Sequence, residues 1–250
     1  MIPEMTMGSG LAFRGKVAVI TGASGGIGES VAVALAREGS RLLLAGRSAE
    51  RLDLVAERAR DFSPGVQTFA ADLTDDDQVH ALAARAVGAF GGVDLLIHSI
   101  GFFAGGLMET APVEDLDQLY RVNLRSPYVL TQALLPTLIA RQGQVVFVNS
   151  GSGYQPARAG WAAYAASKHA LRALADGLRE EVHSKGVRVI TAFPGRTATA
   201  MQEEVHRFEG KPYDPARFLQ PRDVAAVILN ALALPRTAEV TEVRVRPGQG

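Results

Sequence analysis

The stretch Lys16-Val-Ala-Val-Ile-Thr-Gly-Ala-Ser-Gly-Gly-Ile-Gly28 decides the fold of this chain. It begins with a short apolar run, which is typical of a buried strand, and then enters a glycine-rich turn. After the turn, Ile27, Val31 and Leu35 recur at the spacing of one helix face. We therefore predict a strand, a tight turn and a helix in direct succession.

The glycines suggest what the turn is for. Glycine lets backbone N–H groups approach a pyrophosphate closely, and a helix N-terminus adds unpaired donors and partial positive charge. Gly22, Gly26 and Gly28 are not spaced as in G-x-G-x-x-G, so a plain strand-to-helix loop is the alternative. The order of strand, turn and helix favours a phosphate-binding turn.

Apolar runs and helical patterns alternate along the rest of the chain. The runs typical of strands lie at residues 42–45, 66–71, 94–97, 145–148, 187–193 and 240–245. The helical patterns lie at residues 49–60, 79–90, 113–141, 161–184 and 221–234. This alternation predicts an α/β fold, a single Rossmann-like, doubly wound parallel sheet of about seven strands with helices on both faces.

One segment interrupts the alternation. Residues 196–219 are polar and contain Gly210, Pro212 and Pro215, so we predict a substrate-lid insertion after the sixth strand. Its apolar residues at helical spacing, Met201, Val205 and Phe208, either lie over the substrate or pack down onto the protein. We expect residues 1–12 to be a disordered tail and residues 13–250 to form one catalytic domain.

Composition excludes several classes of site. The chain has no cysteine, which excludes disulfides, iron–sulfur clusters, thiolate zinc sites and cysteine nucleophiles. Its 5 histidines show no metal-ligand spacing, so we expect no metal, and His98 is expected to be a hydrogen-bonded structural residue. With 26 basic and 26 acidic residues and no basic run, nucleic acid is not an expected partner. No apolar run reaches about 18 residues and no leader is found, so we expect a cytoplasmic protein without membrane contact.

In a sheet of this kind ligands bind at the carboxyl ends of the strands, where the strand order reverses. The second strand ends at Arg47 with no acid beside it; an arginine there favours a 2′-phosphate, and an acid would favour a free ribose 2′-hydroxyl. Near the third strand, Asp72 either accepts from an adenine amino group or caps a helix that starts near Thr74.

Tyr164 and Lys168 are four residues apart and therefore share one helix face. A nearby ammonium lowers the pKa of a tyrosine, which makes the phenol a possible general acid/base for a substrate oxygen. A surface pair is the alternative. Ser150, at the end of the fifth strand, is a candidate to hydrogen-bond the same oxygen; a turn or N-cap serine is the alternative, and Ser152 competes for the role.

These motifs together resemble the short-chain dehydrogenase/reductase family from about residue 13 to residue 247. Thr21-Gly-Ala-Ser-Gly-Gly-Ile-Gly28 resembles the cofactor turn of the family, and Tyr164-x-x-x-Lys168 its catalytic pair. Asn123, Ser150 and the segment from Pro194-Gly195 to Thr199 resemble its asparagine, its serine and its nicotinamide turn. The resemblance implies a nicotinamide-dependent oxidoreductase with the catalytic residues Asn123, Ser150, Tyr164 and Lys168.

In the implied mechanism, hydride passes between nicotinamide and the substrate carbon while Tyr164 exchanges the proton. Lys168 would lower the Tyr164 pKa and hold the nicotinamide ribose, and the backbone carbonyl of Asn123 would support a water linked to Lys168. The cofactor-binding residues expected from the motifs and the strand ends are Thr21, Gly22, Ser24, Gly26, Ile27, Gly28, Arg47, Asp72, Leu73, Ser99, Gly101, Tyr164, Lys168, Pro194, Gly195, Thr197 and Thr199.

Arg47 favours NADP(H) over NAD(H) as the cofactor. One departure from the family pattern bears on this prediction, because Gly25 stands where some NADP-dependent members have a basic residue. A second departure, His98-Ser-Ile-Gly101 in place of the usual Asn-Asn-Ala-Gly, is expected to leave cofactor binding intact with altered detail. An NAD-dependent alcohol dehydrogenase of the same family therefore remains an alternative. A catalytically idle protein that senses NADP(H) or serves as a scaffold is another.

The expected substrate is a small carbonyl compound or secondary alcohol. Phe102, Phe103, Tyr154 and Phe208 suggest that it is apolar. Apolar residues also wrap around the predicted helix at 113–141 beyond the stripe needed to cover one sheet: Leu116, Leu119, Val122, Val129, Leu130, Ala133 and Leu134. With the helix at 161–184 they predict a homodimer or homotetramer, the assembly that the resemblance also implies; packing under neighbouring elements is the alternative.

Overall fold

A computed structural model describes residues 12–248, so residues 1–11 of the predicted tail lie outside the described part of the chain. Seven strands form one sheet in the order β3-β2-β1-β4-β5-β6-β7, and every neighbouring pair is parallel. The order reverses between β1 and β4, which confirms the doubly wound fold. The strands are β1 (Val17–Thr21), β2 (Arg41–Gly46), β3 (Val66–Ala70), β4 (Leu95–His98), β5 (Gln144–Val148), β6 (Arg188–Pro194) and β7 (Glu242–Val245).

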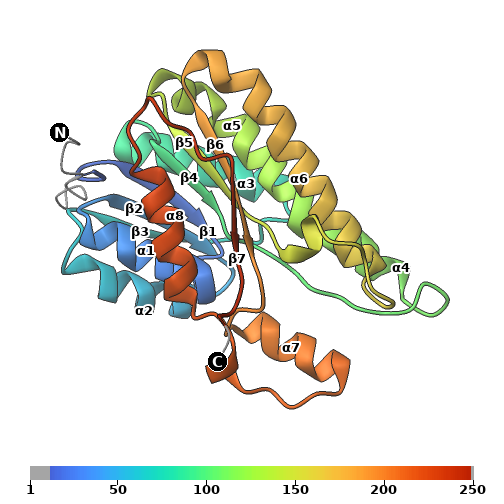
Figure 1. Ribbon diagram of the computed structural model, residues 1–250. Helices are drawn as coiled ribbons and strands as arrows, with labels where there is room; N and C mark the ends of the chain where they lie inside the picture. Colours follow the sequence, from blue (N-terminus) through green and yellow to red (C-terminus); the bar gives the residue numbers. More distant parts are fainter. Residues whose placement is uncertain (1–11, 249–250) are drawn as a thin grey trace, which may run out of the picture.

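Helices cover both faces of this sheet (Figure 1). Side chains of α1, α2 and α8 join one buried cluster, and side chains of α3, α5 and α6 join the other. The helices are α1 (Gly26–Arg37), α2 (Ala49–Arg60), α3 (Asp76–Phe90), α4 (Val113–Tyr120), α5 (Ser126–Ala140), α6 (Ala162–Val182), α7 (Ala200–Glu209) and α8 (Pro221–Leu232).

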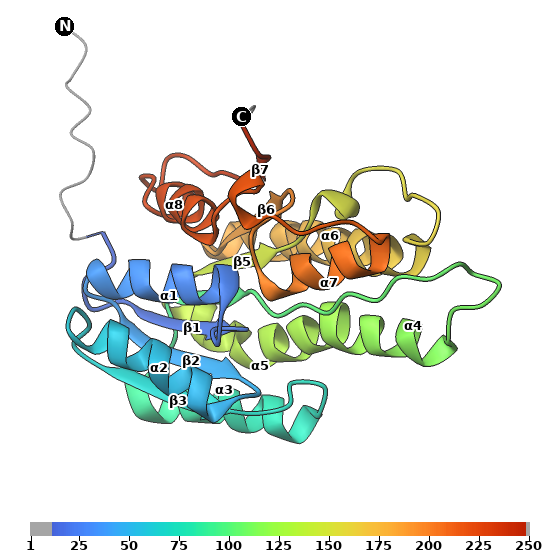
Figure 2. The same ribbon diagram turned by 90° about the horizontal axis from the view of Figure 1, so that it is seen from below.

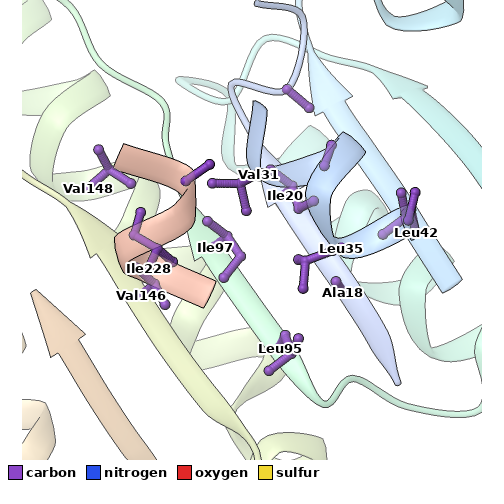
Figure 3. Close-up of a cluster of buried hydrophobic side chains, with 14 of the residues drawn as sticks. Ala18, Ile20, Val31, Leu35, Leu42, Leu95, Ile97, Val146, Val148 and Ile228 are labelled. Atoms are coloured by element: carbon purple, nitrogen blue, oxygen red, sulfur yellow. The ribbon is translucent and has the colours of Figure 1, made fainter. Parts of the chain in front are cut away.

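The strand that opens the chain shows why the apolar runs are continuous. Successive side chains of a strand point to opposite faces, and both faces of β1 are covered. Ala18 and Ile20 belong to the cluster under α1 and α8, where Leu35 packs beside them (Figure 3). Val17 and Val19 belong to the opposite cluster. All four side chains are fully buried, so the strand has no exposed face on which polar residues could alternate with apolar ones.

The long helix expected at residues 113–141 is interrupted. It consists of α4, a π-helical turn η1 (Arg121–Arg125) and α5, with no break in the chain direction. A π turn holds one residue more than an α turn, so it shifts the register of side chains along the helix, and such turns are frequent at functional sites. Asn123 lies at the middle of this turn.

The predicted insertion contains α7 and a short 3₁₀ turn, η4 (Pro215–Arg217). A bridge between Thr197 and Leu219 closes the segment at its base. Figures 1 and 2 show α7 set apart from the two helix layers, on the side of the molecule from which α6 begins. The segment therefore forms a structured extension rather than an open loop.

Candidate active site

A cavity of about 560 Å³ lies at the carboxyl ends of β1, β4, β5 and β6, where the strand order reverses. It has two ends. The β2 end is lined by Ser24, Gly25, Gly46, Arg47 and Arg51, and the α7 end by the 154–158 loop, Trp161, Met201, Gln202 and Val205. Most of the site residues expected from the sequence line this cavity; the exceptions are Thr21, Gly28, Asp72 and Asn123.

The glycine-rich turn after β1 shapes the cavity by close backbone contacts. Gly22 has a φ of 66°, and a Cβ there would lie 2.6 Å from the carbonyl oxygen of Ser99. A Cβ on Gly28 would lie 2.3 Å from the carbonyl oxygen of Gly22. Thr21 ties the turn to β4, because its Oγ1 accepts a hydrogen bond from the Ile100 amide at 3.4 Å. Thr21 and Gly28 thus fix the form of the turn from behind the cavity wall.

Two arginines form the β2 end, and the sequence reasoning found only one of them. Arg47 follows β2, and Arg51 lies in the first turn of α2, where its amide donates to the Ser48 hydroxyl at 3.3 Å. A Cβ on Gly25 would lie 2.8 Å from a terminal nitrogen of Arg51, so this guanidinium occupies the space beside Gly25. Neither arginine side chain has a hydrogen bond or ion pair within residues 12–248. The sequence signal that could have pointed to Arg51 was Ser48, an N-cap residue three positions earlier, which puts Arg51 in the first turn of the helix after β2.

Asp72 does not have the helix-capping role considered for it. The helix begins at Asp76 and its N-cap is Asp75, which accepts from the amides of Asp77 and Gln78. Asp72 is exposed and accepts from the Thr74 amide at 3.0 Å and from the Thr74 hydroxyl at 2.8 Å. Its carboxylate therefore closes a local turn outside the cavity lining, whereas the neighbouring Leu73 does line the cavity.

Tyr164 and Lys168 lie one turn apart on α6 and are both buried, with 6% and 2% exposure. The Nζ of Lys168 is 5.9 Å from the centre of the Tyr164 ring. Burial raises the pKa of Tyr164, and a hydrogen bond with Ser150 opposes this rise. Burial also lowers the pKa of Lys168 to about 8. The expected lowering of the Tyr164 pKa is therefore wrong for the protein without ligands, because loss of hydration outweighs the nearby polar groups.

Ser150 has the capping role, one of the two roles considered for it. It is the N-cap of the 3₁₀ turn η2 (Gly151–Gly153), and its hydroxyl accepts from the Ser152 amide at 3.1 Å. Its side chain also lines the cavity and lies near enough to Tyr164 to act against the rise of the Tyr164 pKa. Ser152 lines the cavity too, but among the described residues its side chain has no such effect on the Tyr164 pKa. The geometry therefore favours Ser150 over Ser152.

Asn123 lies behind the cavity wall and is fully buried. Its side chain accepts from the Phe102 amide at 2.8 Å and donates to the Phe102 carbonyl at 2.9 Å. It also donates to the Ser167 hydroxyl at 3.0 Å. These bonds join the π turn, the segment after β4 and α6. The side-chain oxygen of Asn123 and the Nζ of Lys168 both lie 3.8 Å from the position of a Cβ on Gly101, so the three residues meet at one point.

His98 is a buried hydrogen-bonded residue, as expected. Its Nε2 lies 2.8 Å from the Thr131 hydroxyl, and its ring stacks on Phe147 with centres 5.0 Å apart. Burial lowers the pKa of His98 to about 3, so the ring is neutral near pH 7. The ring does not line the cavity, and its role is to pack β4 against α5.

The aromatic residues of the α7 end are arranged differently from the sequence expectation. Phe102, Phe103 and Phe208 do not line the cavity. The Phe103 ring lies behind the wall, 5.2 Å from the Tyr164 ring and 5.8 Å from the Phe208 ring. Phe208 therefore contacts Phe103 but keeps 42% exposure, while the other two apolar residues of α7, Met201 and Val205, line the cavity.

Within residues 12–248, no three histidine, aspartate or glutamate side chains are grouped so that they could hold a metal ion. No helix in the same part of the chain is long and apolar enough to cross a membrane.

Comparison with known proteins agrees with the fold. The short chain dehydrogenase family matches residues 16–210. An uncharacterized oxidoreductase of Staphylococcus aureus (strain USA300) is 34% identical over 233 residues, which cover 93% of this chain and 97% of that protein. A metagenomic short-chain oxidoreductase solved in complex with NADP has a TM-score of 0.82 and 32% identity, and the match covers 97% of this chain and 100% of that one. An alcohol dehydrogenase of the archaeon Thermococcus sibiricus, complexed with 5-hydroxy-NADP, has a TM-score of 0.84 and 28% identity over 94% of this chain and 97% of its own. This chain therefore belongs to the short chain dehydrogenase family of oxidoreductases.

Proposed function

We propose that this protein is an NADP(H)-dependent oxidoreductase that moves a hydride between nicotinamide and the carbon of a carbonyl or secondary alcohol. The observation that carries the proposal is the meeting of Tyr164, Ser150 and Lys168 in one cavity at the strand ends. A phenol, a hydroxyl and an ammonium together can exchange a proton with a substrate oxygen and stabilise the charge that results.

The residues of the cavity fit a nicotinamide dinucleotide. The turn at Gly22 leaves no room for side chains, and the N-terminus of α1 provides unpaired amides for a pyrophosphate. Lys168 would hold the ribose near Tyr164, and Pro194 and Gly195 would lie against the nicotinamide. When bound, the cofactor supplies or accepts the hydride.

The chain's own residues would handle the proton and the substrate oxygen. Tyr164 gives its hydroxyl proton to that oxygen in reduction and takes it back in oxidation. Ser150 donates a hydrogen bond to the same oxygen and fixes its position. With a pKa of about 8, Lys168 is mostly protonated at pH 7, and its charge favours the phenolate form of Tyr164. In this proposal the backbone carbonyl of Asn123 supports a water that returns a proton toward Lys168.

We infer a preference for NADP(H) from the two arginines of the β2 end. A guanidinium pairs well with a phosphate, and no acid lines the cavity there to receive a free ribose 2′-hydroxyl. In the sequence, Gly25 argued against this inference, because some NADP-dependent members of the family have a basic residue at that position. Arg51 removes the objection, because its guanidinium lies in the space beside Gly25. The bound NADP of the metagenomic relative and the 5-hydroxy-NADP of the Thermococcus enzyme support the same cofactor.

The test is turnover of aldehydes, ketones and secondary alcohols with each of the four nicotinamide cofactors. The proposal expects reduction of carbonyls with NADPH at a higher kcat/KM than with NADH. Equal efficiency with both would contradict the NADP(H) preference, and higher efficiency with NADH would favour an NAD-linked alcohol dehydrogenase instead. Tight NADPH binding with no turnover of any compound would favour the sensor or scaffold.

We also infer a homodimer or homotetramer, but on other residues than those expected from the sequence. Of the seven apolar residues, five are buried within the chain and Ala133 is partly buried, so they pack under neighbouring elements; only Leu116 is exposed. The remaining exposed apolar surface around α4 and α5 consists of Leu107, Met108, Val113, Leu116, Tyr120 and Tyr128. Light scattering at micromolar concentration tests the inference, and a mass near 26.5 kDa would contradict it.

A further inference from the structure

The charged residues around the cavity are of one sign. Six cationic side chains line it and, among its lining residues, there is no aspartate or glutamate. The six are Arg47, Arg51, Arg158, Lys168, Arg196 and Arg246. A surface that carries only positive charge raises the local concentration of anionic ligands and favours their binding.

Four of these cations already have a partner or a proposed role. Arg47 and Arg51 lie at the β2 end, where the 2′-phosphate would bind, and Lys168 lies beside Tyr164. Arg196 is neutralised within the chain, because it forms an ion pair with Glu209 and lies 3.3 Å from the His206 ring. Arg158 and Arg246 are therefore the two cations of the cavity that neither the proposed dinucleotide site nor an internal ion pair uses.

Both remaining arginines lie away from the β2 end. The Arg158 carbonyl accepts a hydrogen bond from the Trp161 amide at 3.0 Å, so Arg158 immediately precedes the residues that open α6 and lead to Tyr164. Arg246 follows β7, whose last residue pairs with Pro194, and its Cα lies 3.4 Å from the position of a Cβ on Gly195.

Neither guanidinium has a hydrogen bond or ion pair with another side chain of residues 12–248. Both are exposed at the cavity rather than folded against an acidic neighbour. An approaching anion would therefore have no internal carboxylate to displace. A guanidinium can hold a carboxylate or a phosphate by two parallel hydrogen bonds.

We infer that the substrate is a carbonyl compound or alcohol that carries an anionic group, a carboxylate or a phosphate ester, held by Arg158 and Arg246. The inference rests on the proposed function, since it names the substrate class of the same site. Trp161, Met201 and Val205 line the same cavity and pack in one apolar cluster with Tyr164, so the part of the substrate that joins the anion to the carbonyl should be apolar.

The experiment compares pairs of probes that differ in charge but keep the same ketone. The carboxylate pair is 4-acetylbenzoate and its methyl ester, and the phosphate pair is 4-acetylphenyl phosphate and 4-methoxyacetophenone. Two quantities are measured for each probe: kcat/KM with NADPH, and the dissociation constant with the NADP⁺-saturated protein by calorimetry. We expect at least one anion to bind and react about tenfold better than its neutral partner, as charge-assisted hydrogen bonds allow.

Three variants test whether the preference for anionic probes depends on the two arginines. Arg158→Ala and Arg246→Ala should each reduce the ratio of anionic to neutral kcat/KM, mainly through the KM of the anion. Arg222→Ala is the matched control, because Arg222 is an exposed arginine on α8 that does not line the cavity, and its ratio should equal that of the unmodified protein.

Each outcome separates the inference from the proposed function. Reduction of the neutral ketones at rates equal to or above those of both anions would overturn the inference and leave the reaction standing. Preferential binding of an anion without reduction of any probe would contradict the reaction and support the anion site. Absence of binding by both anions would overturn the inference.

Discussion

At the β2 end of the cavity, backbone atoms and two arginines form the surface, whereas at the α7 end side chains from several separate segments form it. The β2 end comes from one continuous stretch of chain, residues 22–51, from the turn after β1 to the first turn of α2. The α7 end combines the loop before α6, α6 itself, α7 and the residue after β7. The backbone turn limits which ligands fit at the β2 end. The side chains of the α7 end come from separate segments, so each can be substituted without altering the others. On the function proposed above, cofactor binding and substrate choice should therefore be separable by substitution.

Substitution at the point where the two ends meet should have the largest effect. Tyr164→Phe removes the proton donor but keeps the ring against Phe103, so we expect kcat to fall by about 10²–10⁴ while NADPH affinity is kept. Steady-state rates and a fluorescence titration of NADPH measure the two quantities. A variant that keeps more than about a tenth of the rate would contradict the acid/base role.

Lys168→Met should lower activity and raise stability. The folded-state pKa of about 8 lies below the ordinary value of 10.5, so between these pH values the unfolded chain binds more protons and the free energy of unfolding rises with pH. Below pH 8 the buried ammonium therefore costs stability, up to about 3 kcal/mol for a shift of this size.

Denaturant unfolding of Lys168→Met and of the unmodified protein at pH 7 and pH 10 checks this prediction. The variant should be the more stable of the two at pH 7, and the difference should shrink at pH 10. Its affinity for NADP(H) should also fall, because the same ammonium would hold the ribose. A variant that is less stable at pH 7 would show that burial of Lys168 carries no such cost.

The β2 end can be tested without touching the α7 end. Arg47→Ala and Arg51→Ala should each weaken NADPH binding by about ten- to a hundredfold and leave NADH binding nearly unchanged. Replacement of Gly46 by aspartate, which would favour a free ribose 2′-hydroxyl, is a poorer test. A Cβ added at Gly46 would lie 3.2 Å from the Ser24 hydroxyl, so the new side chain would also disturb the turn. If Arg51→Ala weakened NADPH and NADH equally, Arg51 would not read the 2′-phosphate.

A substitution at the α7 end should change substrate binding and leave cofactor binding unchanged, and the effect should be smaller. Phe208→Ala removes ring contacts with Phe103 and Trp161, at 5.8 Å and 6.5 Å between centres, and loosens the attachment of α7. We expect the KM of a carbonyl substrate to rise roughly two- to tenfold, while the dissociation constant of NADPH stays the same. A change in NADPH affinity alone would show that the two ends are coupled.

The same comparison explains what could be predicted from the sequence. The alternation of strands and helices, the glycine turn and the Tyr164–Lys168 pair depend on local patterns, and the structure has all three. The π turn at Asn123 could not be predicted, because it depends on side-chain bonds to Phe102 and Ser167, far away in the sequence.

Three other features depended on tertiary packing. Arg51 was missed because its closeness to Gly25 arises only when α2 packs beside the turn. The Tyr164 pKa was expected to fall, but spacing along a helix does not report how much water the fold removes. The apolar residues of α5 were assigned to an interface because a helical pattern cannot distinguish a partner chain from α3 or α6.

Transfer of deuterium from NADPH that carries deuterium at both positions of nicotinamide C4 tests the central claim most directly. The unmodified protein and Tyr164→Phe are each incubated with the labelled cofactor and a reducible carbonyl probe, and the alcohol is analysed by mass spectrometry. The account predicts one deuterium on the carbinol carbon with the unmodified protein and a loss of about 10²–10⁴ in its rate of appearance with Tyr164→Phe. Alcohol without the label, or equal labelling rates in the two proteins, would contradict it.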